Sequence, residues 1–114
     1  SKERLLRLLT VEKKAGRRVV GYGATSKSTT ILNYCGIGPE LIEFVSDTTP
    51  IKQNKFTPGM HIPVKPYLVF SDNYPETALL LAWNHQKEIM AKEDEFSKRG
   101  GKWISPIPDK NEIK

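Results

Sequence analysis

Apolar residues in the first part of the chain fall into two patterns, a helical spacing followed by a short continuous run. Residues 2–15 carry leucines at helical spacing and predict an amphipathic helix that ends at Gly16. Arg17–Tyr22 is short and nearly continuous in its apolar residues, which is typical of a strand buried on both faces of a parallel sheet. We predict that Thr25 or Ser26 caps the next helix.

The middle of the chain changes character at a series of prolines. The second helix is predicted to end near Gly36, and Leu41–Ser46 predict a second strand followed by Asp47. Residues 48–66 contain several prolines, which exclude a long regular element, so we predict a long loop. Within it, Ile62–Val64 can pair briefly as an edge strand. A long loop in a compact domain is more often functional than idle.

The last third of the chain predicts a strand, a helix and a final strand. Thr77–Trp83 is the next predicted strand, and Asn84 can cap a helix that runs to about Arg99. The final strand covers Lys102–Ser105, and the residues after Pro106 are predicted to fray.

Strands that alternate with helices imply right-handed crossovers and a parallel sheet covered by helices. The predicted fold class is therefore α/β, a compact Rossmann-like three-layer sandwich with a mostly parallel sheet of about five strands in the order 3-2-1-4-5. Residues 1–114 are expected to form a single domain. In this order, the loops after the first strand and after the Thr77–Trp83 strand face each other across a crevice at the carboxyl ends of the strands.

A loop of small residues follows the first strand and can receive an anion. Gly21-x-Gly23 leads into a helix, so backbone N–H groups and the positive end of the helix dipole point at one spot, where Lys27 adds a charge. Ser26 stands where the third glycine of a dinucleotide fingerprint belongs. Asp47 stands about where an acid would meet a ribose hydroxyl. A tight turn without any ligand explains the loop equally well.

Composition and charge exclude several classes of function. The net charge of +5 favours an anionic partner, but no nucleic-acid-binding motif occurs, so we expect no nucleic acid. Cys35 is the single cysteine and is expected to pack as a small apolar residue. With only two histidines present, a zinc cluster is not expected, and a reducing, cytoplasmic setting fits best. No apolar stretch approaches the ~20 residues that cross a bilayer, so no membrane partner is expected.

Several separated motifs carry a family resemblance. They are Gly-Tyr-Gly-Ala-x-x-Lys at 21–27, Leu-Asn-Tyr at 32–34 with Gly-Ile at 36–37, Asp-x-x-Pro-x-Lys-Gln at 47–53, Pro-Gly-x-x-Ile-Pro-Val at 58–64, Leu-Leu-Ala-Trp-Asn at 80–84, Glu-Ile at 88–89 and Gly-Gly at 100–101. On these motifs, residues 15–108 resemble the C-terminal domain of S-adenosylmethionine-dependent sugar C-methyltransferases. The sequence departs from the family pattern at residues 28–30 and at Asn84-His85.

The resemblance implies a function. In that family the domain follows a zinc-binding module and a central methyltransferase domain, and it helps to hold a nucleotide-linked keto-sugar whose ring carbon is methylated. The resemblance implies that the chain is the C-terminal substrate-binding domain of a longer methyltransferase and packs on the catalytic domain of the same polypeptide. It also implies that S-adenosylmethionine is bound by that catalytic domain. We therefore expect no catalytic residue and no metal ligand here, and no activity of this chain alone.

The candidate substrate-binding residues come from the loops that the topology brings together. They are Tyr22, Gly23, Ala24, Lys27, Ser28, Asp47, Lys52, Gln53, Trp83, Asn84 and His85. Lys27 is expected to meet a diphosphate, with a solvated lysine as the alternative. Tyr22 can stack on a base or close the core, and Asn84 can contact the ligand or cap its helix. His85 is not expected to be catalytic, because no nucleophile or orienting partner is recognisable nearby.

Two further hypotheses come from other classes of function. The first is a free-standing nucleotide-binding module that uses the same crevice for a dinucleotide or an acyl carrier, although the missing third glycine argues against a dinucleotide. The second is a scaffold domain whose crevice is vestigial and whose exposed surface packs on the catalytic domain. An apolar patch without any response to ligands would favour the scaffold.

Overall fold

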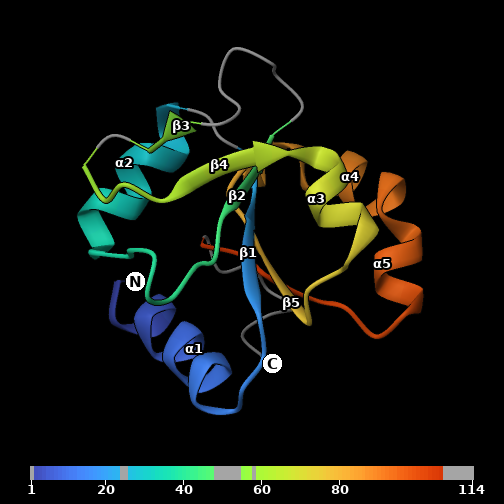
Figure 1. The fold of residues 1–114 in the computed structure, drawn as a ribbon, viewed down its shortest axis with the longest axis horizontal. Helices are drawn as coiled ribbons and strands as arrows, with labels where there is room; N and C mark the ends of the chain where they lie inside the picture. The colour runs from blue at the N-terminus through green and yellow to red at the C-terminus, as the bar shows by residue number, and fades with distance from the viewer. Residues whose placement is uncertain (1, 24–25, 48–54, 58, 107–114) are drawn as a thin grey trace.

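In the part of the chain that the structure describes, six strands form one central sheet (Figure 1). The computed structural model describes residues 2–23, 26–47, 55–57 and 59–106. The strands are β1 (Val19–Tyr22), β2 (Val45–Asp47), β3 (Lys55–Phe56), β4 (Pro63–Pro66), β5 (Thr77–Leu80) and β6 (Lys102–Ile104). Their order across the sheet is β3-β4-β2-β1-β5-β6.

The sheet is mostly parallel, as the sequence predicts. β4, β2, β1, β5 and β6 pair in parallel, and β3 pairs antiparallel with β4 at one edge. Gly21 sits opposite Val45 of β2 and Leu79 of β5, so β1 is central. The predicted order 3-2-1-4-5 is confirmed for the five expected strands, and β3 is an additional one. The assignment to a Rossmann-like three-layer class stays a prediction.

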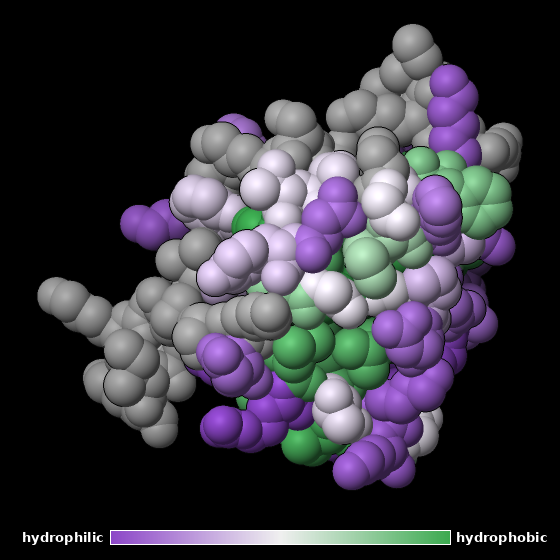
Figure 2. All heavy atoms as spheres, turned by 90° about the vertical axis from the view of Figure 1, so that its left-hand side faces the viewer, coloured by the Kyte–Doolittle hydropathy of each residue, from purple (hydrophilic) through white to green (hydrophobic). Residues whose placement is uncertain are grey.

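Helices lie on both sides of the sheet (Figure 1). They are α1 (Lys2–Lys14), α2 (Ser26–Cys35), α3 (Tyr67–Asp72), the 3₁₀ turn η2 (Trp83–His85), α4 (Gln86–Lys92) and α5 (Asp94–Lys98). α1 and α2 lie on one side, whereas α3, α4 and α5 lie on the other. The first side is seen face-on in Figure 2, where apolar surface is bordered by hydrophilic side chains. Val11 of α1 is 52% exposed.

Successive residues of β1 belong to two hydrophobic clusters, one on each face of the sheet. Val19 belongs to a cluster with Leu5 and Leu9 of α1 and with Leu32 of α2. Its neighbour Val20 belongs to a second cluster, which is rich in aromatic residues. All four residues of β1 are buried, which confirms the prediction of a strand buried on both faces. Cys35 is buried in the first cluster, as expected.

The second cluster is built around Phe70 of α3. Its ring lies 5.4 Å from the Tyr22 ring and 5.4 Å from the Phe96 ring, between centroids. Trp103 of β6 packs edge-on against Tyr22 at 5.6 Å and against Phe96 at 5.2 Å. Edge-to-face contacts of this kind stabilise a core beyond the area that they bury. This cluster therefore joins β1, α3, α5 and β6.

A buried carboxylate ties α1 to the sheet. Glu12 is 1% exposed, and its carboxylate accepts hydrogen bonds from Arg17 Nε at 2.9 Å, from Lys102 Nζ at 2.9 Å and from the Thr77 hydroxyl. The Arg17 hydrogen bond, opposed in part by burial, lowers the pKa of Glu12 to about 2, with Thr77 and Lys102 contributing. α1 ends at Lys14, and the predicted terminator Gly16 follows it in the left-handed conformation (φ 78°).

The strands β1, β2 and β5 are shorter than the sequence predicts. β1 begins at Val19 rather than at residue 17. β2 covers only Val45–Asp47, because the N–H groups of Leu41 and Ile42 bond the Gly38 carbonyl in a turn. β5 ends at Leu80, since the next two N–H groups, of residues 81 and 82, both donate to the Tyr22 carbonyl and end the ladder.

The predicted helix 84–99 is wrong as a single element. The backbone leaves helical geometry at Glu93 (φ −98°, ψ 35°), which separates α4 from α5 and turns Glu93 and Phe96 toward the aromatic cluster. The prediction that Asn84 caps this helix is also wrong. Asn84 lies inside η2, and His85 precedes α4 without a side-chain cap bond.

The proline-rich stretch holds more structure than predicted. β3 falls inside the expected loop, β4 extends the expected edge strand to Pro66, and α3 follows directly. α3 was not predicted, because its short run Tyr67–Asp72 lacks a polar cap and Pro66 precedes it without a cap bond. Much of the expected loop, residues 48–54 and 58, lies outside the described residues, as does Thr25.

Candidate functional site

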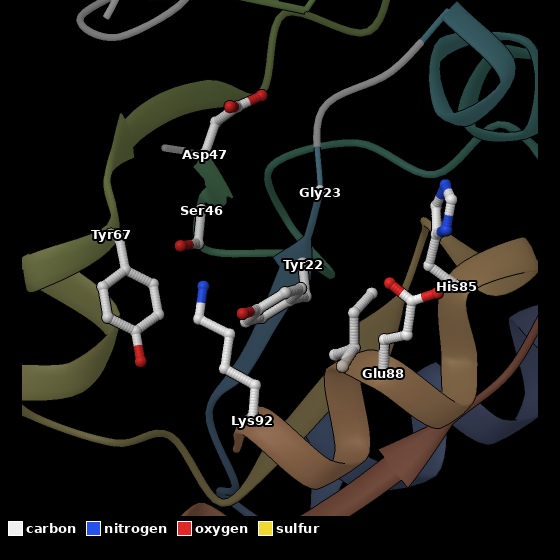
Figure 3. A pocket seen from close by; sticks show the side chains of 9 residues that line it. Tyr22, Gly23, Ser46, Asp47, Tyr67, His85, Glu88 and Lys92 are labelled. Atoms are coloured by element: carbon white, nitrogen blue, oxygen red, sulfur yellow. The ribbon is translucent and has the colours of Figure 1, made fainter. Parts of the chain in front are cut away.

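A pocket of about 370 Å³ opens at the carboxyl ends of β1 and β2 (Figure 3). Its lining residues are Tyr22, Gly23, Ser46, Asp47, Tyr67, His85, Glu88, Ile89 and Lys92. They come from the ends of β1 and β2, from the start of α3, from η2 and from α4. Parallel strands bring their carboxyl ends to one edge, so a crevice for a ligand is expected there.

Gly23 follows β1 at a position where the backbone conformation and close packing require glycine. Gly23 has φ 95°, and its N–H donates to the Ser46 carbonyl at 3.0 Å. A Cβ added at Gly23 would lie 2.9 Å from the Cβ of Ala82. Glycine is therefore required here by its backbone angle and by the close approach of the residues that follow β5.

Two tyrosines form one side of the pocket, and a buried carboxylate, Glu93, lies behind them. The Tyr22 hydroxyl donates to Glu93 Oε2 at 2.6 Å, and the Tyr67 hydroxyl donates to Glu93 Oε1 at 2.9 Å. The two rings are nearly perpendicular, with centroids 6.4 Å apart. Burial, and then the hydrogen bond to Glu93, raise the pKa of both tyrosines far above the usual range. Both phenols therefore stay protonated at neutral pH.

Charged side chains of both signs surround this aromatic wall. Lys92 extends from α4 into the pocket, and its Nζ lies 4.9 Å from the centroid of the Tyr67 ring (Figure 3). Asp47 is 9% exposed at the end of β2, whereas His85 and Glu88 are exposed. Aromatic rings, a cation and carboxylates in one pocket suit a ligand that has a flat or apolar face, an anionic group and hydroxyl groups.

The structure brings together four of the residues predicted from the sequence. Tyr22, Gly23, Asp47 and His85 all line the pocket. Tyr22 also closes the aromatic cluster, so both roles considered for it are compatible. Two other predicted residues do not line it, since Ser28 is buried in α2 and Trp83 is half-buried in η2. The side chains of Lys27 and Asn84 are not described, and Ala24, Lys52 and Gln53 lie outside the described residues.

Five lining residues were missed by sequence reasoning. They are Ser46, Tyr67, Glu88, Ile89 and Lys92. Glu88 and Lys92 are four residues apart on a helix, a spacing that usually marks a solvated face. Tyr67 gave no signal, because its helix was not predicted. Ser46 could have been predicted, since it directly precedes Asp47 at the end of the second strand.

The comparison with known families decides the identity of the chain. The family described as the C-methyltransferase C-terminal domain matches residues 1–108. The chain belongs to this family. The resemblance found from the sequence motifs is thereby confirmed.

A curated relative supports the same assignment. The C-methyltransferase NovU of Streptomyces niveus is 45% identical over 94 residues, which cover 82% of this chain. The aligned part is 22% of NovU, so the chain spans about a fifth of the length of this relative.

The described part of this C-methyltransferase domain has neither a cluster of metal ligands nor a helix that could span a membrane. Within the described ranges, no three or more of the side chains of His, Cys, Asp and Glu gather as a metal site would require. Among the helices of the same ranges, none has the length and apolar character that crossing a membrane demands.

Proposed function

We propose that the pocket at the ends of β1 and β2 binds the nucleotide-linked sugar on which a C-methyltransferase acts. The observation that carries this proposal is that the Tyr22-Gly23 pair, Asp47 and His85, from three separate parts of the sequence, converge on one pocket. In this role the chain holds the substrate, and the methyl transfer takes place on another domain.

The pocket chemistry supports a sugar nucleotide. The Tyr22 and Tyr67 rings offer surfaces for a base or for the apolar face of a sugar. Lys92 supplies a cation for a phosphate, and the Asp47 carboxylate can accept a hydrogen bond from a sugar hydroxyl. Lys27, Lys52 and the N–H groups of the loop after β1 remain in the proposal as further phosphate contacts.

Substrate holding is a physical requirement of carbon methylation. The reacting ring carbon has to be aligned closely with a methyl donor, and alignment of this kind lowers the barrier substantially. The nucleotide is far from the reacting carbon, so its binding energy can be used to fix the sugar. A domain that grips the nucleotide therefore contributes to the rate without contacting the transferred methyl group.

The methyl donor implied by the family is S-adenosylmethionine. Packing against Leu81 and Val45 accounts for Gly21 in β1, and packing against Ala82 accounts for Gly23 after it, so neither glycine is explained by a bound donor. We therefore place the donor on the catalytic domain.

A second role, docking of the catalytic domain, is favoured by apolar exposure beside the pocket. Leu68 and Val69 of α3 are 64% and 38% exposed, and they directly follow the pocket residue Tyr67. A catalytic domain has to approach the pocket opening for its donor to reach a bound sugar. We place its docking surface on α3.

An NMR titration of the ¹⁵N-labelled chain with dTDP-glucose tests substrate binding. We expect amide shifts at residues 22–23, 46–47, 67 and 85–92. Lys92→Gln should weaken binding about tenfold, the size of one lost charge-assisted contact. Lys87→Gln is the matched control, because Lys87 is an exposed lysine of the same helix that does not line the pocket.

Three outcomes would contradict the proposal. If Lys92→Gln and Lys87→Gln bind dTDP-glucose with equal affinity, the ligand does not bind in this pocket. A response to NAD in the absence of any response to dTDP-glucose would favour the free-standing nucleotide-binding module, and silence toward both would favour the scaffold.

A further inference from the structure

The carboxylate of Glu93 is buried directly behind the pocket, where both of its oxygens bond the tyrosines of the pocket wall. It is 1% exposed, and among the residues that the structure describes no cation forms an ion pair with it. Burying a carboxylate is costly unless hydrogen bonds replace its water. Two phenol hydroxyls replace that water here, at 2.6 Å and 2.9 Å.

The two donors to Glu93 are the two tyrosines of the pocket wall. Tyr22 comes from the end of β1 and Tyr67 from the start of α3, so one carboxylate bridges two elements that are 45 residues apart in the sequence. Hydrogen bonds to a charged acceptor are strong and directional. Each ring is therefore held in one rotation and at one depth relative to the other.

The tyrosine wall in turn locates the pocket cation. Lys92 lies next to Glu93 in the sequence, and its Nζ sits over the Tyr67 ring at 4.9 Å from the centroid. An aromatic ring attracts a cation only when the face of the ring is turned toward the cation. The orientation of Tyr67 therefore sets where the Lys92 ammonium rests.

We infer that Glu93 is a positioning residue of the substrate pocket, which holds the Tyr22 and Tyr67 rings and, through Tyr67, the Lys92 ammonium in the geometry that receives a sugar nucleotide. The identity of the ligand in this inference rests on the proposed function. The positioning of the side chains by Glu93 does not depend on it. Glu93 does not line the pocket, and it acts through the side chains that do.

The experiment combines a ligand-free signal with a binding measurement. In the free chain, the Lys92 Hε protons should resonate upfield of those of Lys87, because they lie over the Tyr67 ring. Glu93→Gln and Tyr67→Phe should both move this resonance toward that of Lys87. Glu93→Gln removes the charge and one of the two acceptor oxygens that hold the tyrosines, and Tyr67→Phe removes the hydroxyl donor but keeps the ring. Tyr67→Phe also keeps the experiment decisive if Glu93→Gln folds poorly.

Matched controls are available in the same region. Tyr74→Phe removes a hydroxyl from the same aromatic cluster, but Tyr74 does not line the pocket. Glu95→Gln neutralises an exposed carboxylate two residues away. Both controls should leave the Lys92 resonance and the dTDP-glucose affinity unchanged, whereas Glu93→Gln and Tyr67→Phe should weaken binding about tenfold, which corresponds to about 1.4 kcal/mol.

The outcomes separate this inference from the proposed function. A Lys92 resonance that matches Lys87 in the unaltered chain, or that stays in place in Glu93→Gln, overturns the inference. Equal dTDP-glucose affinity of the unaltered chain and Glu93→Gln overturns it as well, while the proposed function stands. A shift that responds as expected in a chain that binds no dTDP-glucose supports the positioning role and rejects the proposed function.

Discussion

The Glu12 carboxylate shows how one residue of a surface helix can join distant parts of the chain. Its oxygens face Arg17 in the turn after α1, Thr77 at the start of β5 and Lys102 at the start of β6. Its side chain is 2% exposed, while those of Arg17 and Lys102 are 42% and 55% exposed. The carboxylate therefore carries the desolvation cost, and its partners offset that cost.

Replacing Glu12 tests this arrangement at the residue scale. Glu12→Gln should lower the free energy of unfolding by about 2–3 kcal/mol at pH 7, because the charge that orients three donors is lost. Urea unfolding followed by circular dichroism measures the difference. Glu3→Gln, at an exposed position of the same helix, should change it by less than about 0.5 kcal/mol.

The same contribution depends on pH with a definite sign. Folding lowers the pKa of Glu12 from 4.5 to about 2, so the stabilisation is fully present above pH 4.5 and is lost as the pH falls toward 2. The stability gap between the unaltered chain and Glu12→Gln should therefore be constant between pH 6 and 7 and should shrink between pH 4.5 and 3. A gap that is unchanged at pH 3 would contradict the assignment.

At the scale of elements, the turn from α5 to β6 depends on two adjacent glycines for different reasons. Gly100 has φ 89° and open space around its Cα, so a side chain there meets only backbone strain. A Cβ on Gly101 would lie 2.5 Å from the Phe96 ring. The second glycine therefore lets β6 pass close to α5.

Alanine substitutions should separate these two requirements. Gly100→Ala should cost about 1 kcal/mol of unfolding free energy, and Gly101→Ala about 2–3 kcal/mol, because the Phe96 ring has to move within a packed core. Gly16→Ala is the control for strain alone, since Gly16 also has a positive φ and open space. Equal costs at 100 and 101, measured by urea unfolding, would show that the ring is not a constraint.

Elements also show what the sequence could and could not predict. The positions of the strands followed from short apolar runs bounded by turn residues, which are local signals. Their order was assumed from the usual arrangement of a Rossmann-like sheet, and no local pattern determines it. The break at Glu93 was hidden, because Lys92 and Glu93 belong to an alternation of charges that is typical of a solvated helix. The partners of Glu93 lie on β1 and on the unpredicted α3, so only tertiary structure could reveal its burial.

The same distinction applies to the candidate site. Tyr22, Gly23 and Asp47 were predicted because they stand at strand ends, and strand ends of a parallel sheet share one edge. Tyr67 and Lys92 reach that edge from helices whose orientation the sequence leaves open. The residues at the strand ends were thus predictable from the sequence pattern. The side of the pocket that Tyr67 and Lys92 form depended on how the helices pack against the sheet.

At the scale of the whole molecule, the chain matches 22% of the length of NovU, so surfaces that would meet other domains matter. The α3 face exposes Leu68 next to the pocket, whereas Val11 is exposed on α1 across the sheet. Leu68 and Val11 are both apolar and both more than half exposed. Replacing each by serine therefore compares the two faces of the protein with similar changes.

A separately produced C-methyltransferase catalytic domain provides the test of docking. Leu68→Ser should weaken its association with the chain about fivefold to tenfold, as expected for the loss of a buried leucine side chain at an interface. Val11→Ser should leave the association unchanged. Sedimentation velocity measures both, and the reverse order of effects would move the docking surface to the α1 and α2 side.

Trp103 gives the aromatic cluster an optical consequence. Its indole packs edge-on against Tyr22 at 5.6 Å between ring centroids, and Tyr22 forms part of the pocket wall. Indole fluorescence follows the polarity and motion of its immediate neighbours, so any ligand that displaces Tyr22 alters the light that Trp103 emits. The chain has two tryptophans, and with Trp83 replaced by phenylalanine a single fluorophore remains to report occupancy of the pocket from inside the core.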